Sequence, residues 1–337
     1  MSAETTPRTI RWGMIGCGDV AEVKSGPAFY KAANSSLVAV MRRNGPLAED
    51  FARRHGVGRW HDDAEAIIRA PDIDAVYIAT TTDSHFDYTL RCAAAGKAVY
   101  VEKPMGMSHA QCLEMVAACR QAKVPLWVGF YRRALPRFLQ LRDILQSGVI
   151  GDVRAVVSRQ SQRPPTSEQL QSHYIAWRTD AARSGGGFFF EAIGHTFDIF
   201  DFLLGPIDKV QGIASNQAGL WQSEDMVTAS YRFASGVQGS GAWCFAADRD
   251  EEYHEIIGSK GRVRFSVYKT VPMVLTVGDA VQEIPVSDPP HVHQPLVQTI
   301  VDEMNGHGHC ASTGESGART AWVVDEILRD FKRSSAP

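Results

Sequence analysis

The sequence predicts an α/β protein of two domains: a doubly wound parallel sheet, followed by an α+β domain with a largely antiparallel open sheet. Up to about residue 128, short apolar runs typical of buried strands alternate with segments of helical length. From about residue 152, consecutive strand-like runs are separated by short turns that contain glycine. We therefore expect residues 1–128 to form the first domain and residues 129–337 the second. A last helix near 315–332 is expected to pack back toward the first domain.

The first strand is followed at once by a glycine-rich motif. Residues 10–15 read as a strand, and the next six residues have the pattern G-x-G-x-x-A. Glycines at these positions allow a tight turn and let backbone N–H groups approach a pyrophosphate at the start of a helix, here expected to run to about residue 33. The pattern predicts a Rossmann dinucleotide-binding domain, the alternative being a merely structural turn. The cofactor-binding residues predicted here are Gly16, Gly18, Asp19, Val20 and Ala21.

Two arginines follow the second strand, which is expected at residues 37–41. Dinucleotide folds that prefer NAD usually carry an acidic residue there, on the ribose 2′-hydroxyl. This chain has Arg42 and Arg43 instead, and no acidic residue before Glu49. A guanidinium group binds a 2′-phosphate bidentately. We expect NADP(H) to be preferred, with NAD(H) possible; the alternative is that both arginines are simply solvated.

The next two buried strands also end in polar residues. The strand at 75–79 runs into Thr80, Thr81 and His85, and the strand at 98–101 ends in Glu102 and Lys103. Ligands bind at the carboxyl edge of an open parallel sheet. These five residues are therefore candidates to contact a bound cofactor, and Lys103 can act there as a hydrogen-bond donor, a charge or an acid. The alternative is that Lys103 is an ordinary surface lysine.

The second half carries another group of candidates. Strands are expected at 153–158, 210–215, 227–233, 237–243, 254–257, 263–267 and 274–277, and a polar loop at 161–171 is either a substrate lid or a plain connection. Three glycines at 185–187 precede a helix expected at 188–204, and they let the backbone approach a ligand. Glu191 and His195 are four residues apart and share one helix face, and Asp198 could orient the imidazole. His195 either transfers a proton or is a buried structural histidine.

Taken together, the motifs resemble one known family. The order G-x-G-x-x-A, A-T-x-x-x-x-H and A-G-K-x-V-x-x-E-K-P resembles the glucose–fructose oxidoreductase, inositol dehydrogenase and rhizopine-catabolism family (Gfo/Idh/MocA). Its members are NAD(P)-dependent oxidoreductases of sugars, cyclitols and related hydroxyl or carbonyl compounds. The resemblance continues at residues 129–133, 148–151, 177–178, 185–195 and 313–315, and so covers essentially the whole chain.

The resemblance implies roles for particular residues. Lys103, His195 and Glu191 are expected to be catalytic, with the first two facing a cleft between the domains. The substrate-binding residues implied are Lys103, Arg133, Trp177, Arg178, Glu191 and His195. Two departures stand out: Thr80-Thr81 replaces a frequent Thr-Pro, and Glu191 replaces a common Asp. The resemblance also implies that one face of the second sheet packs against a second subunit, in a homodimer or homotetramer.

Composition narrows the remaining possibilities. A net charge of −3 indicates neither nucleic acid nor an anionic membrane as a partner. Six scattered cysteines, none in a C-x-x-C pair, favour reduced thiols and a cytoplasmic location. Residues 1–8 form a short polar leader without an apolar segment, so no signal peptide is expected. The histidines at 291, 293, 307 and 309 lack partners at zinc-site spacing, so we expect no metal, although His293 could contact substrate.

The function expected is hydride transfer between a nicotinamide, preferably of NADP, and a hydroxyl or carbonyl carbon of a sugar, cyclitol or related small molecule. The resemblance is compatible with two other functions. One is a dinucleotide-responsive regulator without turnover, which would not need both Lys103 and His195. The other is a glycosidase that recycles a tightly held cofactor.

Overall fold

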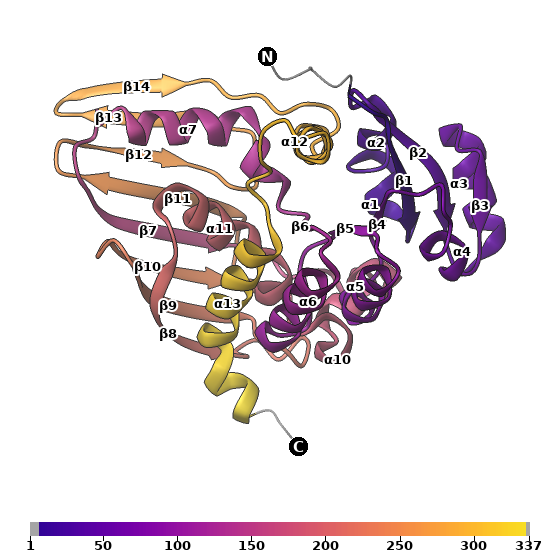
Figure 1. The fold of residues 1–337 in the computed structure, drawn as a ribbon. Helices are drawn as coiled ribbons and strands as arrows, with labels where there is room; N and C mark the ends of the chain where they lie inside the picture. Colours follow the sequence, from indigo (N-terminus) through magenta and orange to yellow (C-terminus); the bar gives the residue numbers. More distant parts are fainter. Residues whose placement is uncertain (1–6, 335–337) are drawn as a thin grey trace, which may run out of the picture. The chain divides into compact units, whose positions relative to one another are not determined.

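The computed structural model describes residues 7–334, apart from the side chains of residues 173, 174 and 182. Residues 1–6 of the predicted leader lie outside the described residues. The chain forms two compact units (Figure 1). The first contains the chain up to Gly106, together with Ala110–Leu135 and Pro289–Gly317. The second contains Met107–His109, Pro136–Asp288 and the chain from Ala318 onward.

The first unit is built on a six-stranded parallel sheet. Its strands are β1 (Ile10–Ile15), β2 (Ser35–Met41), β3 (Arg59–His61), β4 (Ala75–Ile78), β5 (Ala98–Val101) and β6 (Leu126–Val128). They are arranged in the order β3-β2-β1-β4-β5-β6, and every pair is parallel. The strand order reverses beside β1, and doubly wound folds bind ligands in the crevice that forms at such a point. The predicted Rossmann architecture is therefore confirmed.

Helices and short helical turns connect these strands. They are α1 (Asp19–Val23), α2 (Ala28–Lys31), α3 (Gly45–His55), α4 (Glu65–Ile68), η1 (Thr82–Ser84), α5 (His85–Ala94), α6 (His109–Ala122) and η2 (Tyr131–Ala134). The prediction of one helix up to residue 33 is wrong, because the segment is split into α1 and α2. The N–H groups of Ser25 and Gly26 bond back to Val20 and Ala21 and close α1. Pro27, which has no N–H to continue a helix, stands at the N-cap of α2.

The core of the first unit includes a helix from the end of the chain. Trp12 and Tyr100 from the sheet belong to an apolar cluster with Phe29 of α2. Helix α12 (Gln294–Met304) adds Leu296 and Ile300 to the same cluster. The sequence placed residues 289–317 with the second domain, but the apolar face of α12 is buried in the first unit. The predicted domain boundary at residue 128 remains a prediction.

The second unit is built on an eight-stranded sheet. Its strands are β7 (Val153–Ser161), β8 (Ile207–Ser215), β9 (Met226–Phe233), β10 (Gln238–Cys244), β11 (Glu251–Gly258), β12 (Gly261–Phe265), β13 (Met273–Val277) and β14 (Ala280–Ile284). Their order is β14-β13-β12-β11-β7-β10-β9-β8. Only β7 and β10 pair in parallel among these strands, so the predicted largely antiparallel sheet is confirmed. The sequence did not predict β14.

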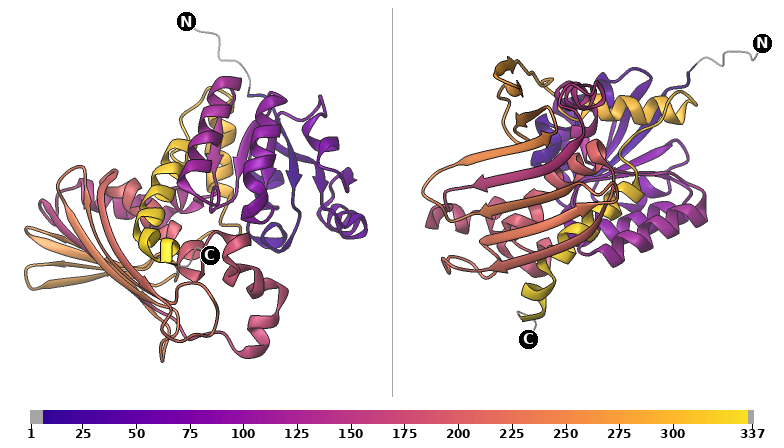
Figure 2. Two further views of the ribbon diagram at one scale, coloured as in Figure 1. Left: turned by 90° about the horizontal axis from the view of Figure 1, so that it is seen from below. Right: turned by 90° about the vertical axis from the view of Figure 1, so that its left-hand side faces the viewer.

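Long helices pack on one face of this sheet: α7 (Pro136–Gln146), α11 (Phe188–Leu204) and α13 (Gly314–Ser334). Figure 2 shows the yellow helix α13 against that face. Phe197 of α11 meets the rings of Tyr231 and Trp243 edge-on or tilted, with centroids 5.4 and 5.8 Å away. At Gly212 of β8 a Cβ atom would lie 2.5 Å from the backbone oxygen of Ile327, so this glycine permits the close approach of α13. The alternating burial of residues along β9 and β10 shows that one face of the sheet is buried and the other more exposed.

The segment after β7 is more ordered than a plain loop. Strand β7 extends to Ser161, so the predicted loop at 161–171 begins later than expected. Helix α8 (Ser167–Gln171) has a capping box, in which Thr166 accepts a hydrogen bond from the backbone of Gln169 and the Gln169 side chain accepts one in return. Two more short helices follow, α9 (His173–Thr179) and α10 (Ala181–Ser184).

The structure also bears on two expectations from composition. None of the six cysteines, all of which lie within the described residues, forms a disulfide bond, and five of them are buried. Among the described residues, no helix is both long enough and apolar enough to cross a membrane.

Candidate active site

The two glycines of the G-x-G-x-x-A loop are needed for different reasons. Gly16 has a φ of +99°, and a Cβ atom there would lie 2.7 Å from the backbone of Ala79 in the neighbouring strand segment. Gly18 has an ordinary extended backbone, and a Cβ atom there would meet no described atom within 4 Å. The protein's own packing therefore explains Gly16 but not Gly18. Open space at Gly18, at the N-terminus of α1, fits a loop that admits a pyrophosphate.

Arg42 lies beside this loop. Its backbone N–H donates to the oxygen of His61, at the end of the neighbouring strand, at 3.1 Å. The N–H groups of Gly16 and Cys17 donate to the oxygen of Met41, the residue directly before Arg42, at 2.8 and 3.2 Å. Arg42 is half-buried, whereas Arg43 is exposed. The structure therefore brings Arg42, more than Arg43, to the loop predicted to hold the cofactor.

Polar residues after β4 form a hydrogen-bonded turn at the carboxyl edge of the sheet. The Ser84 hydroxyl donates to Oγ1 of Thr80 at 2.6 Å, and the Thr81 hydroxyl donates to Asp83 at 2.6 Å. The two ring nitrogens of His85 lie 2.8 Å from the oxygen of Pro104 and 3.0 Å from that of Thr80. His85 is buried and joins the turns that follow β4 and β5, so both ring nitrogens face the protein's own backbone. Its role as a cofactor ligand stays a prediction.

Lys103 follows β5 at the same edge and is half-buried. Its neighbour Glu102 is buried, and the Tyr77 hydroxyl donates to Glu102 Oε1 at 2.6 Å. Burial raises the pKa of the Glu102 carboxyl, while the hydrogen bond from Tyr77 and the charge of Lys103 oppose that rise. The lysine is thus presented at the ligand-binding edge beside a carboxyl group that is held in place.

In the second unit, the three glycines before α11 accommodate the protein's own atoms. A Cβ atom at Gly185 would lie 2.6 Å from the ring of Phe190, and the same ring crowds Gly186. At Gly187 a Cβ atom would lie 2.8 Å from the hydroxyl of Ser223 and 3.0 Å from the carboxyl carbon of Glu224. Internal packing therefore explains these three glycines, which the sequence led us to expect beside a ligand.

Glu224 caps the N-terminus of α11, which the sequence did not predict. Its Oε1 accepts hydrogen bonds from the N–H groups of Gly187 at 2.9 Å and Phe190 at 3.2 Å. Only 1% of Glu224 is exposed, and burial raises the pKa of its carboxyl against the effect of these hydrogen bonds. A carboxylate at this position satisfies N–H groups that a helix start leaves unpaired. The cap orients the helix that carries Glu191 and His195.

Several predicted substrate residues lie close together around α11. Arg178 Nη2 is 3.9 Å from Glu191 Oε1, and the guanidinium of Arg178 lies 5.7 Å from the centre of the Trp177 ring. His195 is 5% exposed, and its ring centroid is 6.4 Å from that of Tyr268. The sequence did not predict a role for Tyr268.

Tyr268 is anchored to the helix beside His195. Its hydroxyl donates to the backbone oxygen of Ala192 at 2.5 Å and lies 3.3 Å from the Thr196 hydroxyl. Asp198 is fully buried on the same helix, and the orienting role predicted for it stays a prediction. Arg133, also predicted to bind substrate, belongs to the first unit and is 5% exposed; its guanidinium donates to the oxygen of Ala311 at 3.0 Å.

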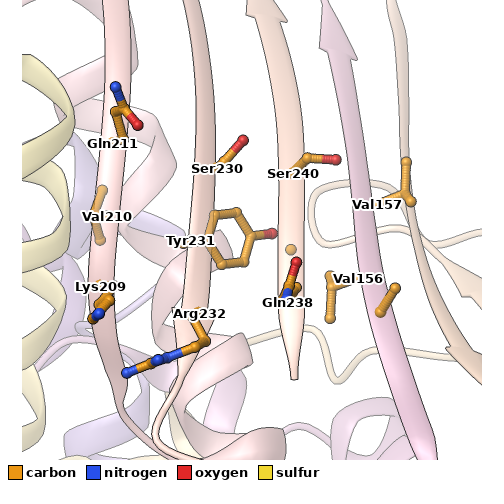
Figure 3. A pocket seen from close by; sticks show the side chains of 12 residues that line it. Val156, Val157, Lys209, Val210, Gln211, Ser230, Tyr231, Arg232, Gln238 and Ser240 are labelled. Atoms are coloured by element: carbon orange, nitrogen blue, oxygen red, sulfur yellow. The ribbon is translucent and has the colours of Figure 1, made fainter. Parts of the chain in front are cut away.

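A shallow depression of about 540 Å³ lies elsewhere, on the exposed side of strands β7, β8, β9 and β10 (Figure 3). Lys209, Gln211, Arg232 and Gln238 are among its lining residues, and Arg232 is paired with Asp208 at 2.7 Å. None of the predicted catalytic or cofactor-binding residues lines it. This surface is part of the sheet face expected to pack against a second subunit.

Comparison with protein-family models supports the class that fold and motifs define. The model described as an oxidoreductase family with an NAD-binding Rossmann fold matches residues 10–130. The model of the GFO/IDH/MocA C-terminal domain matches residues 138–264. The protein is thus an oxidoreductase with an NAD(P)-binding Rossmann domain. It belongs to the GFO/IDH/MocA family, as the motifs led us to expect.

Individual relatives cover nearly the whole chain. Oxidoreductase P35 of Formosa agariphila is 38% identical over 318 residues, which span 94% of this chain and 97% of the relative. The 1,5-anhydro-D-fructose reductase of Ensifer adhaerens is 30% identical and covers 91% of this chain and 92% of its own length. Among solved structures, a levoglucosan dehydrogenase in complex with NADH and levoglucosan has a TM-score of 0.82 at 22% identity, covering 97% of this chain and 98% of its own. That structural likeness shows a shared fold.

Proposed function

We propose that the protein is an NADP-preferring oxidoreductase that transfers a hydride between the nicotinamide and a hydroxyl or carbonyl carbon of a sugar, cyclitol or related small molecule. The observation that carries the proposal is the carboxyl edge of the parallel sheet, where a glycine loop with unexplained open space at Gly18 and the half-buried Lys103 both lie. Membership of an oxidoreductase family and the reductase activity named for the Ensifer relative support the reaction class.

The cofactor, when bound, supplies the hydride chemistry. The N–H groups at the start of α1 bind the pyrophosphate, and Arg42 binds the 2′-phosphate of NADP through a charge-assisted contact. Thr80 and Thr81 contact the nicotinamide half from the turn after β4. The preference for NADP depends on Arg42 in particular, since Arg43 is exposed.

Side chains of the protein transfer one proton and stabilise one developing negative charge. Lys103 donates a hydrogen bond to the reacting oxygen and stabilises its negative charge as a carbonyl is reduced. His195 delivers the proton to that oxygen in reduction and accepts it in oxidation, since an imidazole titrates near neutrality. Glu191, beside Arg178, orients the substrate hydroxyls.

Two measurements test this proposal. The purified protein is screened with NADP⁺, NADPH, NAD⁺ and NADH against sugars, cyclitols, dihydrodiols and dicarbonyls, with nicotinamide absorbance as the readout. On the best substrate, His195→Ala and Lys103→Met are expected to lower kcat by about 10²–10⁴, while NADPH affinity stays near that of the wild type. A correctly folded His195→Ala enzyme that keeps most of its kcat contradicts the assignment of the proton donor.

Glu191→Gln distinguishes two roles for the carboxylate. If Glu191 only orients hydroxyl groups, the variant raises KM with little change in kcat. If it is itself the proton donor, the variant lowers kcat.

A further inference from the structure

A buried polar cluster in the first unit lies directly behind Lys103. Glu102 is 7% exposed, and its two oxygens have different partners. Oε1 accepts a hydrogen bond from the Tyr77 hydroxyl at 2.6 Å, and Oε2 accepts one from the backbone N–H of Lys103 at 3.1 Å. A Cβ atom at Gly129 would lie 3.0 Å from both oxygens and the carboxyl carbon, so the carboxyl group packs closely against this glycine, which follows β6. Glu102 therefore holds the backbone from which the Lys103 side chain starts.

His293 reaches the same carboxyl group from a distant part of the sequence. Its Nε2 lies 3.5 Å from Glu102 Oε1, and its Nδ1 lies 2.8 Å from the hydroxyl of Tyr100. The histidine is 1% exposed, and burial, followed by the charges of Lys24, Arg132 and Lys103, lowers its pKa to about 3. The ring is therefore neutral at physiological pH. With the Tyr100 hydroxyl as the donor to Nδ1, the ring proton lies on Nε2, toward Glu102.

The backbone of the same segment holds the helix that follows the glycine loop. The N–H of His293 donates to the oxygen of Lys24 at 3.3 Å, and Nδ1 of His291 lies 2.8 Å from the oxygen of Val23. These are carbonyl groups at the C-terminal end of α1, which the helix itself leaves without partners. Residues 291–293 therefore connect the end of α1 with the carboxyl group beside Lys103.

We propose that His293 is a positioning residue for the reaction: it fixes Glu102, and through Glu102 the backbone of Lys103, relative to the glycine loop. The inference depends on the catalytic role proposed for Lys103. A reacting group that is displaced by about 1 Å can cost about 10² in rate, so a neutral ring that contacts no substrate still affects turnover. The sequence offered only metal binding or substrate contact for this histidine.

A second buried histidine provides a matched control. His254 in the second unit is fully buried, with Nε2 2.8 Å from Glu252 Oε1 and Nδ1 3.0 Å from the Ser158 hydroxyl. It has the same kind of partners as His293, but it is none of the residues proposed to bind cofactor or substrate. Replacing either histidine by leucine removes a buried histidine beside a buried glutamate, and both changes are expected to lower stability.

The experiment compares His293→Leu, His293→Gln and His254→Leu in the full chain, by thermal unfolding, NADPH affinity, kcat and KM. His293→Leu is expected to lower kcat at least about tenfold. His293→Gln is expected to keep much of the wild-type kcat, because its amide can donate toward Glu102 and accept from Tyr100. His254→Leu lowers the unfolding temperature and leaves kcat near the wild-type value. A folded His293→Leu enzyme with wild-type kcat overturns the proposal.

Two further variants keep the outcome decisive. If His293→Leu does not fold, Tyr100→Phe removes the hydroxyl that sets the ring proton while keeping the buried ring; an unchanged kcat in that variant overturns the proposal. Lys103→Met is measured in parallel. If Lys103→Met keeps its kcat, the proposed function itself fails. If Lys103→Met is inactive and the His293 variants are not impaired, only the positioning role fails.

Discussion

Alanine substitutions at the two loop glycines are expected to have different effects: Gly16→Ala lowers stability, and Gly18→Ala weakens cofactor binding. Gly16→Ala puts a side chain at a φ of +99° and a Cβ atom 2.7 Å from the backbone of Ala79. The conformational strain alone costs about 1–3 kcal/mol, and a backbone neighbour cannot rotate away. Gly18→Ala puts a Cβ atom into open space at a φ of −105°, where alanine changes stability by at most about +0.4 to +1 kcal/mol through the unfolded state.

Gly18→Ala, which changes stability little, is expected to weaken cofactor binding. If the backbone near Gly18 must approach a pyrophosphate, the added methyl group prevents a charge-assisted hydrogen bond worth about 1.5–3 kcal/mol. That corresponds to a loss of NADPH affinity of about tenfold to a hundredfold. Urea unfolding followed by circular dichroism measures stability, and quenching of tryptophan fluorescence by NADPH measures the Kd. A Gly18→Ala protein that binds NADPH as tightly as the wild type refutes the reasoning.

Three further results are expected. Arg42→Asp should lower NADPH affinity about tenfold to a hundredfold relative to NADH by calorimetric titration, and equal affinities for both cofactors in the wild type contradict the NADP preference. Burial raises the pKa of the Glu224 carboxyl above its value in the unfolded chain. The stability of the wild type relative to Glu224→Gln is therefore greatest below about pH 4.5 and falls as pH rises through the folded-state pKa. Urea unfolding of both proteins at pH 5 and pH 8 measures this difference, and a relative stability that increases with pH contradicts the prediction. Light scattering is expected to show an oligomer that Ile213→Asp dissociates, since Ile213 is 74% exposed on the outer face of β8, and a monomeric wild type at micromolar concentration argues against the interface.

The errors and omissions of the sequence analysis have a common origin in packing. One continuous helix was expected after the glycine loop, because the segment contains residues that favour helix, yet Gly26 and Pro27 close α1 and start α2 anew. Glycines 185–187 suggest room for a ligand, but the ring of Phe190 and the Glu224 carboxyl lie where their side chains would be. Glycine in a sequence indicates that a side chain is not tolerated, and it does not identify the neighbour that excludes it.

The sequence by itself determined the alternation of strands and helices along the first half of the chain, the glycine loop, the Glu102-Lys103 pair after β5, and the family. These features depend on local periodicity and on fixed spacings within short segments, which are legible along one stretch of chain. Only the tertiary structure decided that His293 reaches Glu102 and Tyr100, that Glu224 caps α11, and that α12 belongs to the core of the first unit. Tyr100 and His293 are 193 residues apart. Such a contact exists because two buried surfaces fit one another, and no local pattern near either residue encodes its partner.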